Sequence, residues 1–342
     1  MPTLRTLKDL EREGLVAPDP RLGQVADGMA IALTEEMLGQ IDRRDPASDP
    51  IARQFVPDLR ELIVAPGEIG DPIGDEARSP IKGIVHRYPD RVLLKPLHAC
   101  PVYCRFCFRR EKVGPGAESL NDAELGAALD YIRARPEIWE VILTGGDPLM
   151  MAPRRLAALI ESLDAIAHVA VIRVHSRVPI VEPSRVSGEL AQTLRARRAA
   201  VWLSVHCNHS RELTAATRAA LSRLAEAGLP LIGQTVLLSG INDDIDTLER
   251  LMRDLVSCRV KPNYLHHPDL VRGTGHFRVS VERGQELMKA LRGRLSGLAQ
   301  PTYVLDVPGG HGKVPIGPAY LGDDPEALSI EDAFGGRHPY PG

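Results

Sequence analysis

From Arg91 onward, short apolar runs alternate with longer amphipathic stretches about six times. The apolar runs are RVLLKPL, EVILTG, VAVIRVHS, AVWLSVH, LIGQTVLL, VKPNYLHH and TYVLDV. Near-continuous apolar runs of this length are typical of parallel strands that are covered on both faces, and the stretches between them predict helices. Right-handed crossovers through these helices leave two architectures, a β/α barrel and a doubly wound sheet.

The first 85 residues have a different pattern, in which short helical segments such as LTEEMLGQI are broken by loops. Prolines punctuate the region at Pro46, Pro50, Pro57, Pro66, Pro72 and Pro80. We therefore expect a helical N-terminal extension over residues 1–85, an α/β domain over residues 86–320 and a tail over residues 321–342.

The composition is that of an ordinary globular protein, with 44% hydrophobic and 25% charged residues in a chain of 342. The formal net charge of -3 provides no electrostatic footprint for nucleic acid or an anionic membrane. The N-terminus has no apolar core, and no later run approaches the roughly 18 to 20 apolar residues of a membrane span. These features predict a cytoplasmic protein with a small-molecule partner.

Polar residues follow nearly every predicted strand. They are Gly145, Gly146, Asp147, His175, His206, Asp269 and Asp306, and Gln234 lies within the fifth run. In a β/α barrel the carboxyl ends of the strands converge on one face, where barrel enzymes place their active sites. Any one of these residues is as well explained by a structural role in a loop as by a functional role. Because such residues follow nearly every predicted strand, the set as a whole favours a functional site.

Three cysteines lie within eight residues in the segment HACPVYCRFC, at Cys100, Cys104 and Cys107. Three thiolates can bind three corners of an Fe4S4 cube and leave the fourth iron free for a substrate or cofactor. Structural zinc is the alternative, but it needs four ligands and only His98 is near enough to complete the set. The spacing favours the cluster. The isolated Cys207 and Cys258 are interpreted as buried bystander thiols.

The motif CPVYCRFC, together with HRYPDRVLL, LTGGDPL and VPGGHGK, resembles the lysine 2,3-aminomutase family of radical S-adenosylmethionine (SAM) enzymes over residues 80–320. The resemblance implies a partial (β/α)6 barrel with a helical N-terminal extension. It also implies a [4Fe-4S] cluster, SAM, pyridoxal 5'-phosphate (PLP) and an external electron donor such as flavodoxin or ferredoxin. The implied reaction is an isomerisation that moves the α-amino group of L-lysine to the β-carbon.

The resemblance assigns a lysine and a phosphate cradle to PLP. Lys313, in PGGHGK, corresponds to the lysine that binds PLP in this family, and a partly desolvated lysine can form a Schiff base with an aldehyde. Without the resemblance, a surface lysine after a flexible turn would be the better interpretation. Arg87, Tyr88 and Arg91 match the family's phosphate cradle, and arginine suits phosphate because its planar fork donates two bonds at once.

The resemblance also implies a substrate site and a SAM site. Arg109 matches the arginine that holds the substrate carboxylate, and Asp269 and Asp306 match the aspartates that bind the ε-ammonium of lysine. Two facing carboxylates favour a dibasic substrate over an acidic one. The residues that match the SAM pocket are Gly145, Gly146, Asp147, His206 and Gln234.

Two departures qualify the match. Phe106 stands where clostridial lysine mutases carry a histidine. The segment CRFCFRR resembles instead the short proteobacterial branch of the family, which is linked to elongation factor P modification. The segment DVPGGHGK, in contrast, resembles the enzymes that act on free lysine. The chain continues only to residue 342 after Lys313, without the longer C-terminal segment that helps the larger mutases assemble. The oligomeric state is therefore left undetermined.

Two other functions stay open at this point. The same chemistry on arginine or on a peptide-borne lysine is an alternative within the enzyme class. A non-catalytic metal-binding or redox-sensing protein is an alternative outside it, but it leaves Lys313 and the aspartate pair as coincidences.

Overall fold

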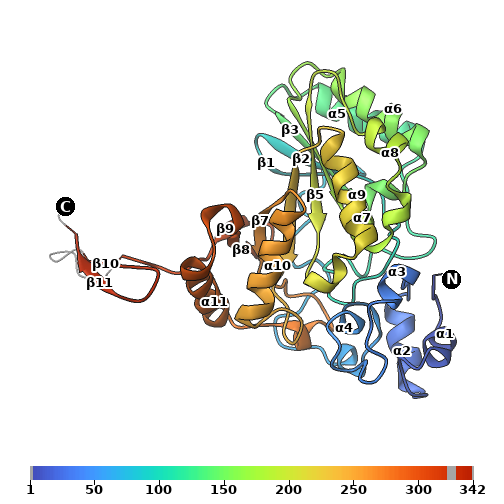
Figure 1. Ribbon diagram of the computed structural model, residues 1–342. Helices are drawn as coiled ribbons and strands as arrows, with labels where there is room; N and C mark the ends of the chain where they lie inside the picture. The colour runs from blue at the N-terminus through green and yellow to red at the C-terminus, as the bar shows by residue number, and fades with distance from the viewer. Residues whose placement is uncertain (1–2, 322–328, 341–342) are drawn as a thin grey trace.

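The computed structural model describes residues 3–321 and 329–340, and its centre is one nine-stranded sheet in which the spatial order of the strands equals their order in the chain (Figure 1). The strands are β1 (Ile84–Tyr88), β2 (Arg91–Leu97), β3 (Glu140–Gly145), β4 (Val171–Ser176), β5 (Ala200–His206), β6 (Leu231–Val236), β7 (Val260–His266), β8 (Thr302–Val307) and β9 (Gly312–Pro315). Neighbours from β2 to β8 are parallel, whereas β1 and β9 pair antiparallel at the two ends.

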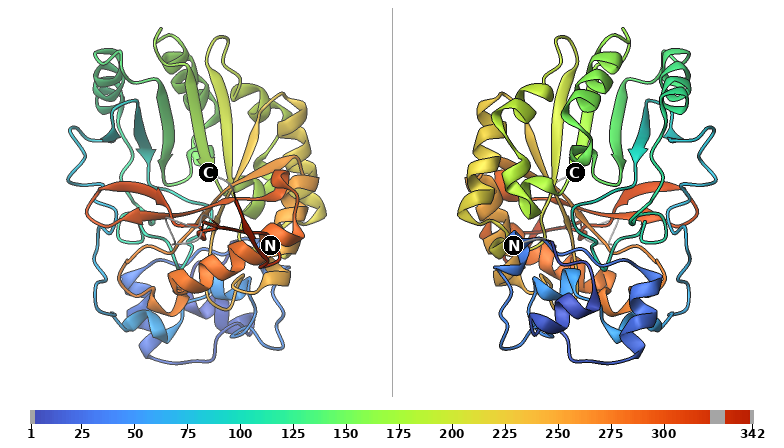
Figure 2. Two further views of the ribbon diagram at one scale, coloured as in Figure 1. Left: turned by 90° about the vertical axis from the view of Figure 1, so that its left-hand side faces the viewer. Right: turned by 90° about the vertical axis from the view of Figure 1, so that its right-hand side faces the viewer.

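This strand order decides between the two architectures that the sequence left open. A doubly wound sheet reverses its strand order at a switch point, and no reversal occurs here. Among the described strands no pairing joins β1 to β9, so the curved sheet is a barrel that stays open on one side (Figure 2). The predicted partial barrel is confirmed.

Helices connect consecutive parallel strands and cover the outside of the sheet (Figure 1). They are α5 (Asp122–Arg133), α6 (Pro153–Asp164), α7 (Val178–Val181), α8 (Gly188–Thr193), α9 (Ala215–Glu226), α10 (Ile245–Ser257) and α11 (Val281–Arg294). The helix α10 shows why they pack this way, because its buried residues Leu248, Leu251, Met252 and Leu255 recur at helical spacing on one face. Each such side chain contributes roughly 1.5 to 3 kcal/mol when fully buried.

The strands β2, β3, β5 and β8 coincide residue for residue with the apolar runs of the sequence, whereas β1 and β9 were not predicted as strands. Both are short, lie at the ends of the sheet and carry polar side chains. Their strand conformation comes from pairing with β2 and β8, which their own pattern does not reveal.

The N-terminal extension contains α1 (Leu7–Arg12), α2 (Arg21–Gly28), α3 (Glu35–Leu38), α4 (Ala52–Phe55) and the 3-10 helix η1 (Leu59–Leu62). These short helices lie below the strands in Figure 2. Residues between them contact segments that follow the carboxyl ends of the strands. For example, Thr34 donates to the carbonyl of Val181 at 2.6 Å, and the amide of Ile69 donates to Leu270 at 2.9 Å. The extension therefore covers the face on which barrel sites lie.

A loop of the extension also lies at the open side of the barrel, beside β9. The amide of Gly309 donates to the carbonyl of Pro72 at 3.4 Å. Gly74 has a φ of +66°, and a Cβ there would lie 2.7 Å from the amide nitrogen of Gly310. Only glycine permits this approach of two backbones, so the loop is held against the turn that precedes Lys313.

The C-terminal hairpin, β10 (Ser329–Glu331) and β11 (Arg337–Pro339), projects away from the barrel (Figure 1). None of the described helices is long and apolar enough to cross a membrane.

Candidate active site

The three cysteines of the motif lie in the loop between β2 and α5, which buried arginines tie to the N-terminal extension. Arg105 is fully buried, and its Nε and Nη2 atoms donate to Glu61 at 2.8 and 2.6 Å. Arg110 donates to the same carboxylate. Because Glu61 belongs to η1, the extension forms part of the cysteine site. Nothing in the local sequence indicated this contact, since the partners are 44 residues apart.

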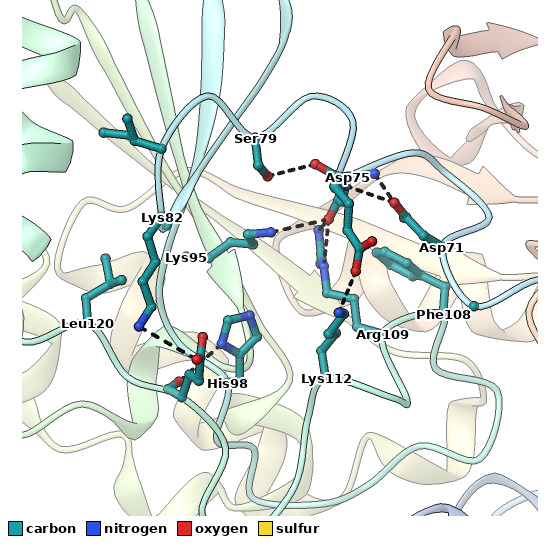
Figure 3. Close-up of a pocket in the computed structure, with 15 residues that line it drawn as sticks. Asp71, Asp75, Ser79, Lys82, Lys95, His98, Phe108, Arg109, Lys112 and Leu120 are labelled. Carbon is teal, nitrogen blue, oxygen red and sulfur yellow. Dashed lines mark hydrogen bonds and ion pairs between the residues drawn. The ribbon is translucent and has the colours of Figure 1, made fainter.

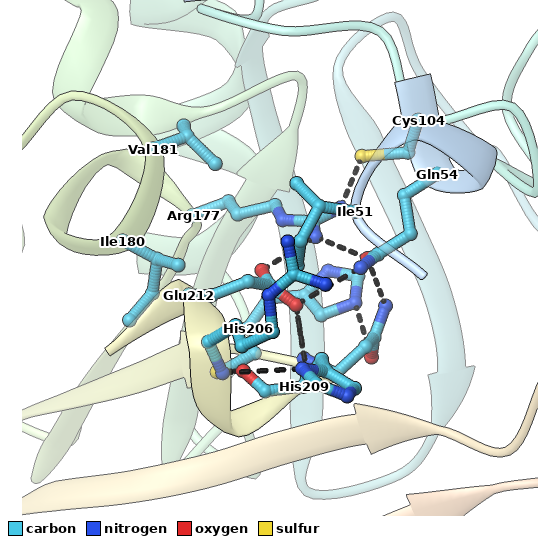
Figure 4. Close-up of polar contacts among 12 residues, drawn as sticks. Ile51, Gln54, Cys104, Arg177, Ile180, Val181, His206, His209 and Glu212 are labelled. Atoms are coloured by element: carbon cyan, nitrogen blue, oxygen red, sulfur yellow. Dashed lines mark hydrogen bonds and ion pairs between the residues drawn. The ribbon is translucent and has the colours of Figure 1, made fainter. Parts of the chain in front are cut away.

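Arg177, which follows β4, faces the sulfur of Cys104 (Figure 4). Its Nη1 atom lies 2.8 Å from Cys104 Sγ, while Nη2 donates to Glu212 at 2.8 Å and to Gln54 at 2.6 Å. A buried guanidinium beside a sulfur stabilises the thiolate form, which is the form that binds metal. Arg177 and Glu212 were not predicted from the sequence, although Arg177 directly follows one of the predicted strands.

Burial raises the pKa of Cys107 to about 11. Burial also raises the pKa of Cys104, while the nearby Arg177 acts in the opposite direction. The Nδ1 atom of His98 lies 3.1 Å from the carbonyl oxygen of Glu118.

Within residues 3–321 and 329–340, no three His, Cys, Asp or Glu side chains converge on one metal position. In an Fe4S4 cube each thiolate binds a different iron, so this chemistry does not require such convergence.

Gly145, Gly146 and Asp147 close the carboxyl end of β3 against the start of the cysteine loop. A Cβ on Gly146 would lie 2.3 Å from the carbonyl oxygen of Ala99, so glycine is required for the contact. The carboxylate of Asp147 accepts from Ser176 Oγ at 2.8 Å and from the amide of Arg177 at 2.7 Å. Asp147 thus joins the ends of β3 and β4, which positions Arg177 beside Cys104. Its predicted contact with SAM stays a prediction.

His206 and Gln234 end up side by side, because they are register partners on β5 and β6. Burial lowers the pKa of His206 to about 3, so its imidazole is neutral. Gln234 Nε2 lies 3.4 Å from His266 Nε2, and His266 Nδ1 lies 3.4 Å from Lys313 Nζ. His266, which the sequence analysis did not single out, therefore links the residues predicted for SAM to the lysine predicted for PLP.

Lys313 and Asp306 are direct cross-strand partners on β9 and β8, and their side chains form an ion pair. The amide of Lys313 donates to the hydroxyl of Tyr88 at 2.6 Å. The guanidinium of Arg91 lies 3.7 Å from the centre of the Tyr88 ring, and Arg87 lies 3.6 Å from Asp306. The structure thus brings the HRYPDR motif and the PGGHGK motif together.

Asp75 also belongs to this site, and no motif of the sequence predicts it. Its carboxylate lies 2.9 Å from Arg109 Nη2 and 3.9 Å from Lys95 Nζ (Figure 3). It also lies 3.2 Å from Arg87 Nη2. The close backbone contact at Gly74 holds Asp75 in this place. Its local sequence, a run of Gly, Asp and Pro, predicts only a loop.

Asp269 and Asp306 line one cavity of about 200 Å³. Burial raises the pKa of Asp269 to about 7, and the negative charge of Asp306 acts in the same direction. Two carboxylates that share a small cavity favour a cation between them, since the cation relieves both the repulsion and the lost hydration.

Comparison with known proteins decides the family. Residues 94–254 match the radical SAM superfamily, and residues 288–336 match the lysine-2,3-aminomutase family. The chain is 40% identical over 320 residues to the L-lysine 2,3-aminomutase of Acetoanaerobium sticklandii, covering 93% of this chain and 77% of that one. The chain belongs to the lysine 2,3-aminomutase family. It is also 40% identical to the Clostridium subterminale L-lysine 2,3-aminomutase over 300 residues (88% and 72% of the two chains).

The family also contains enzymes named for another amino acid. The chain is 38% identical to the glutamate 2,3-aminomutase of Clostridioides difficile over 290 residues, covering 85% of this chain and 68% of that one. As a lysine 2,3-aminomutase family member, the protein is an isomerase of the radical SAM type that uses a [4Fe-4S] cluster and SAM.

Proposed function

We propose that the protein is a PLP-dependent 2,3-aminomutase that moves the α-amino group of free L-lysine to the β-carbon, giving β-lysine. The observation that carries the proposal is the arrangement around β8 and β9, where Lys313 pairs with Asp306 and Asp306 shares a cavity with Asp269. A lysine suited to PLP and an acidic pair suited to an ammonium thus occupy one corner of the barrel.

In this proposal Cys100, Cys104 and Cys107 hold the cluster, and Gly145, Gly146, Asp147, His206 and Gln234 contact SAM. The Arg177 contact with Cys104 Sγ supports the first part, because a cation beside a sulfur suits a metal-bound thiolate. A cytoplasmic location and electrons from flavodoxin or ferredoxin belong to the same proposal.

Charge supports the placement of PLP between Lys313 and the HRYPDR motif. Four cations, Arg87, Lys95, Arg109 and Lys313, lie around three carboxylates, Asp75, Asp306 and Asp269, which leaves one more cation than anions even when Asp269 is ionised. A phosphate group supplies the missing negative charge, and Arg87, Tyr88 and Arg91 would hold it. When bound, PLP would carry the migrating nitrogen and would delocalise an unpaired electron.

The residues of this chain would place the substrate. Arg109, whose Nε and Nη2 atoms donate to Asp75, would bind the α-carboxylate through Nη1, and Asp269 and Asp306 would bind the distal ammonium. Holding both ends of lysine fixes the β-carbon in position and converts binding energy into orientation. The acidic pair favours lysine over glutamate, because a second carboxylate there would be repelled.

The test is anaerobic incubation of the reconstituted protein with SAM, reductant and L-lysine, followed by chromatography for β-lysine. Parallel reactions with L-arginine, L-glutamate and a peptide with N-terminal lysine separate the alternatives. β-Lysine as the main product supports the proposal, whereas faster conversion of arginine or of the peptide assigns the same chemistry to that substrate. A protein that holds its cluster and SAM but converts none of these substrates contradicts the proposal.

The acidic pair gives a quantitative prediction. Each charge-assisted hydrogen bond contributes roughly 1.5 to 3 kcal/mol, so Asp269→Asn should weaken productive binding of lysine by about one to two powers of ten. Asp306→Asn should have at least this effect, because it also removes the partner of Lys313. Loss should appear in both kcat and KM, since the ammonium contact positions the reacting carbon. The cluster spectrum should not change.

The control is Asp254→Asn, which removes a carboxylate that pairs with Arg218 on the outside of the barrel. Lysine kinetics within about twofold of wild type in both site variants would show that the dibasic assignment is wrong, even if the mutase chemistry survives.

The pKa of Asp269 predicts a pH dependence. Its carboxyl group is mostly neutral below the value of about 7 and mostly anionic above it. Because the lysine ammonium prefers the anion, the KM for lysine should fall about tenfold as the pH rises from about 6 to about 8. Asp269→Asn should remove this dependence. A KM that stays pH-independent in the wild type would contradict a role for Asp269 in binding the ammonium.

A further inference from the structure

Lys95 is the cation near Asp75 that makes the weakest contact with it. Arg109 donates to Asp75 through Nε at 3.1 Å and Nη2 at 2.9 Å, whereas Lys95 Nζ stays 3.9 Å away. No described residue accepts a hydrogen bond from Lys95 Nζ, although an ammonium has three donors. Asp75 therefore balances part of the charge of Lys95, but the three N–H donors of the Lys95 ammonium stay unused.

The side chain of Lys95 is also poorly hydrated, being only 15% exposed. Burial lowers the pKa of Lys95, which means that its charged form loses stabilisation by water. A buried ammonium with unused donors is unfavourable unless another group satisfies it. The position therefore favours an anionic ligand that comes from outside the chain.

Two other lysines that line the same cavity show the contrast. Lys82 donates to Glu124 at 2.9 Å, and Lys112 pairs with Glu76. These two side chains are 46% and 54% exposed, so they are ordinary surface ion pairs. Lys95 differs from both in its burial and in its unused donors.

The place of Lys95 in the fold indicates what it faces. Val92 and Leu94 on β2 belong to the hydrophobic core, and alternation along the strand puts Lys95 on the opposite face. Figure 3 shows Lys95 and Arg109 pointing toward Asp75 from two different segments. Lys95 and Arg109 both line a cavity of about 380 Å³.

We propose that Lys95 acts beside Arg109 as a second cationic anchor for the substrate carboxylate, so that the enzyme selects a free amino acid over the same residue in a peptide. This inference rests on the proposed function, which places the carboxylate at Arg109. A migrating α-amino group must be free, so a peptide substrate would carry its lysine at the N-terminus. Its carboxyl group would then be a neutral amide, which two cations bind poorly.

The experiment measures binding without turnover. L-Lysine and L-lysinamide, which differ in the charge of the carboxyl group, are titrated calorimetrically into the reconstituted holoenzyme in the absence of reductant. The wild type should bind lysine more tightly than lysinamide. Lys95→Met keeps the apolar stem and removes the ammonium, so the Kd for lysine should rise about tenfold to hundredfold while the Kd for lysinamide stays within about threefold.

Two further variants separate charge from packing. Lys95→Arg keeps a cation and should bind lysine within about threefold of wild type. Lys82→Met removes a lysine from the lining of the same cavity. It should change the Kd of neither lysine nor lysinamide, because Lys82 is already paired with Glu124. If Lys95→Met is too unstable to purify, the Arg variant decides, since equal binding of lysine and lysinamide by it would overturn the proposal.

The outcomes distinguish this inference from the proposed function. Lysine binding by Lys95→Met within about twofold of wild type overturns the inference, even if β-lysine is formed. An equal loss for lysine and lysinamide also overturns it, because it indicates a structural role. A borohydride-trapped PLP adduct on Lys95 overturns it as well. Discrimination that depends on Lys95, in an enzyme that makes no β-lysine, would sustain the inference and refute the proposed function.

Discussion

Cys104→Ala is expected to abolish the iron–sulfur cluster and, with it, all detectable formation of β-lysine. Three thiolates hold the Fe4S4 cube in this proposal, so loss of one leaves two irons without a protein ligand. The substitution also leaves Arg177, whose Nη1 atom lies 2.8 Å from Cys104 Sγ, without its sulfur partner. Anaerobically reconstituted wild type should contain about four irons per chain and absorb broadly in the visible range, and the variant should show neither property.

The matched control is Cys258→Ala. Cys258 is also a buried thiol beside a guanidinium, with Arg218 Nη1 3.3 Å from its sulfur, but it lies at the end of α10, outside the motif. This variant should keep its iron content and activity. Stoichiometric zinc without iron in the reconstituted wild type would contradict the cluster, and full iron content in Cys104→Ala would remove Cys104 from the ligand set.

Lys313 is expected to be the residue that reacts with PLP. Borohydride reduction of the PLP-loaded protein should fix the cofactor covalently, and peptide mapping should find it in the segment PGGHGK. Lys313→Ala should lower kcat by roughly three powers of ten or more, because it removes the group that binds the cofactor covalently. The neighbours of Lys313 suit this role, since Asp306 pairs with its ammonium and Tyr88 accepts a hydrogen bond from its amide.

Lys261→Ala is the control for this prediction, since Lys261 makes its hydrogen bonds to the backbone carbonyls of Pro262 and Gln300. Lys261→Ala should form the same borohydride-trapped PLP adduct as the wild type and should convert lysine at the same rate. A PLP adduct on any lysine other than Lys313 would reassign the cofactor site. Iron content should be unchanged in Lys313→Ala, which separates loss of PLP from loss of the cluster.

The parallel strands were the most predictable part of the fold. Runs such as EVILTG and AVWLSVH are apolar because both faces of a parallel strand are covered, so their bounds could be read from hydrophobicity alone. The same pattern did not distinguish a barrel from a doubly wound sheet. The choice between the two architectures depends on which strands become neighbours. The pairing of β4 with both β3 and β5, for example, cannot be read from the sequence of any one of these strands.

The candidate site was predictable where motifs are local. Spacing alone favoured a cluster at Cys100, Cys104 and Cys107, because all three ligands lie on one short loop. The other assignments came from resemblance. Asp75, Arg177 and Lys95 were missed because their neighbours do not mark them, and a charged residue in a loop or on a strand is usually solvated.

The sequence by itself determined the order of strands and helices, the three thiols on one loop, and the family motifs around Lys313 and Arg87. Only the tertiary structure decided which cationic side chains contact the same carboxylate. Tyr88 and Lys313 are 225 residues apart and yet in contact, and Asp75 reaches Arg109 across 34 residues. The physical reason is that local patterns report burial and backbone conformation, whereas the electrostatics of a site depend on distances that exist only after the barrel has formed.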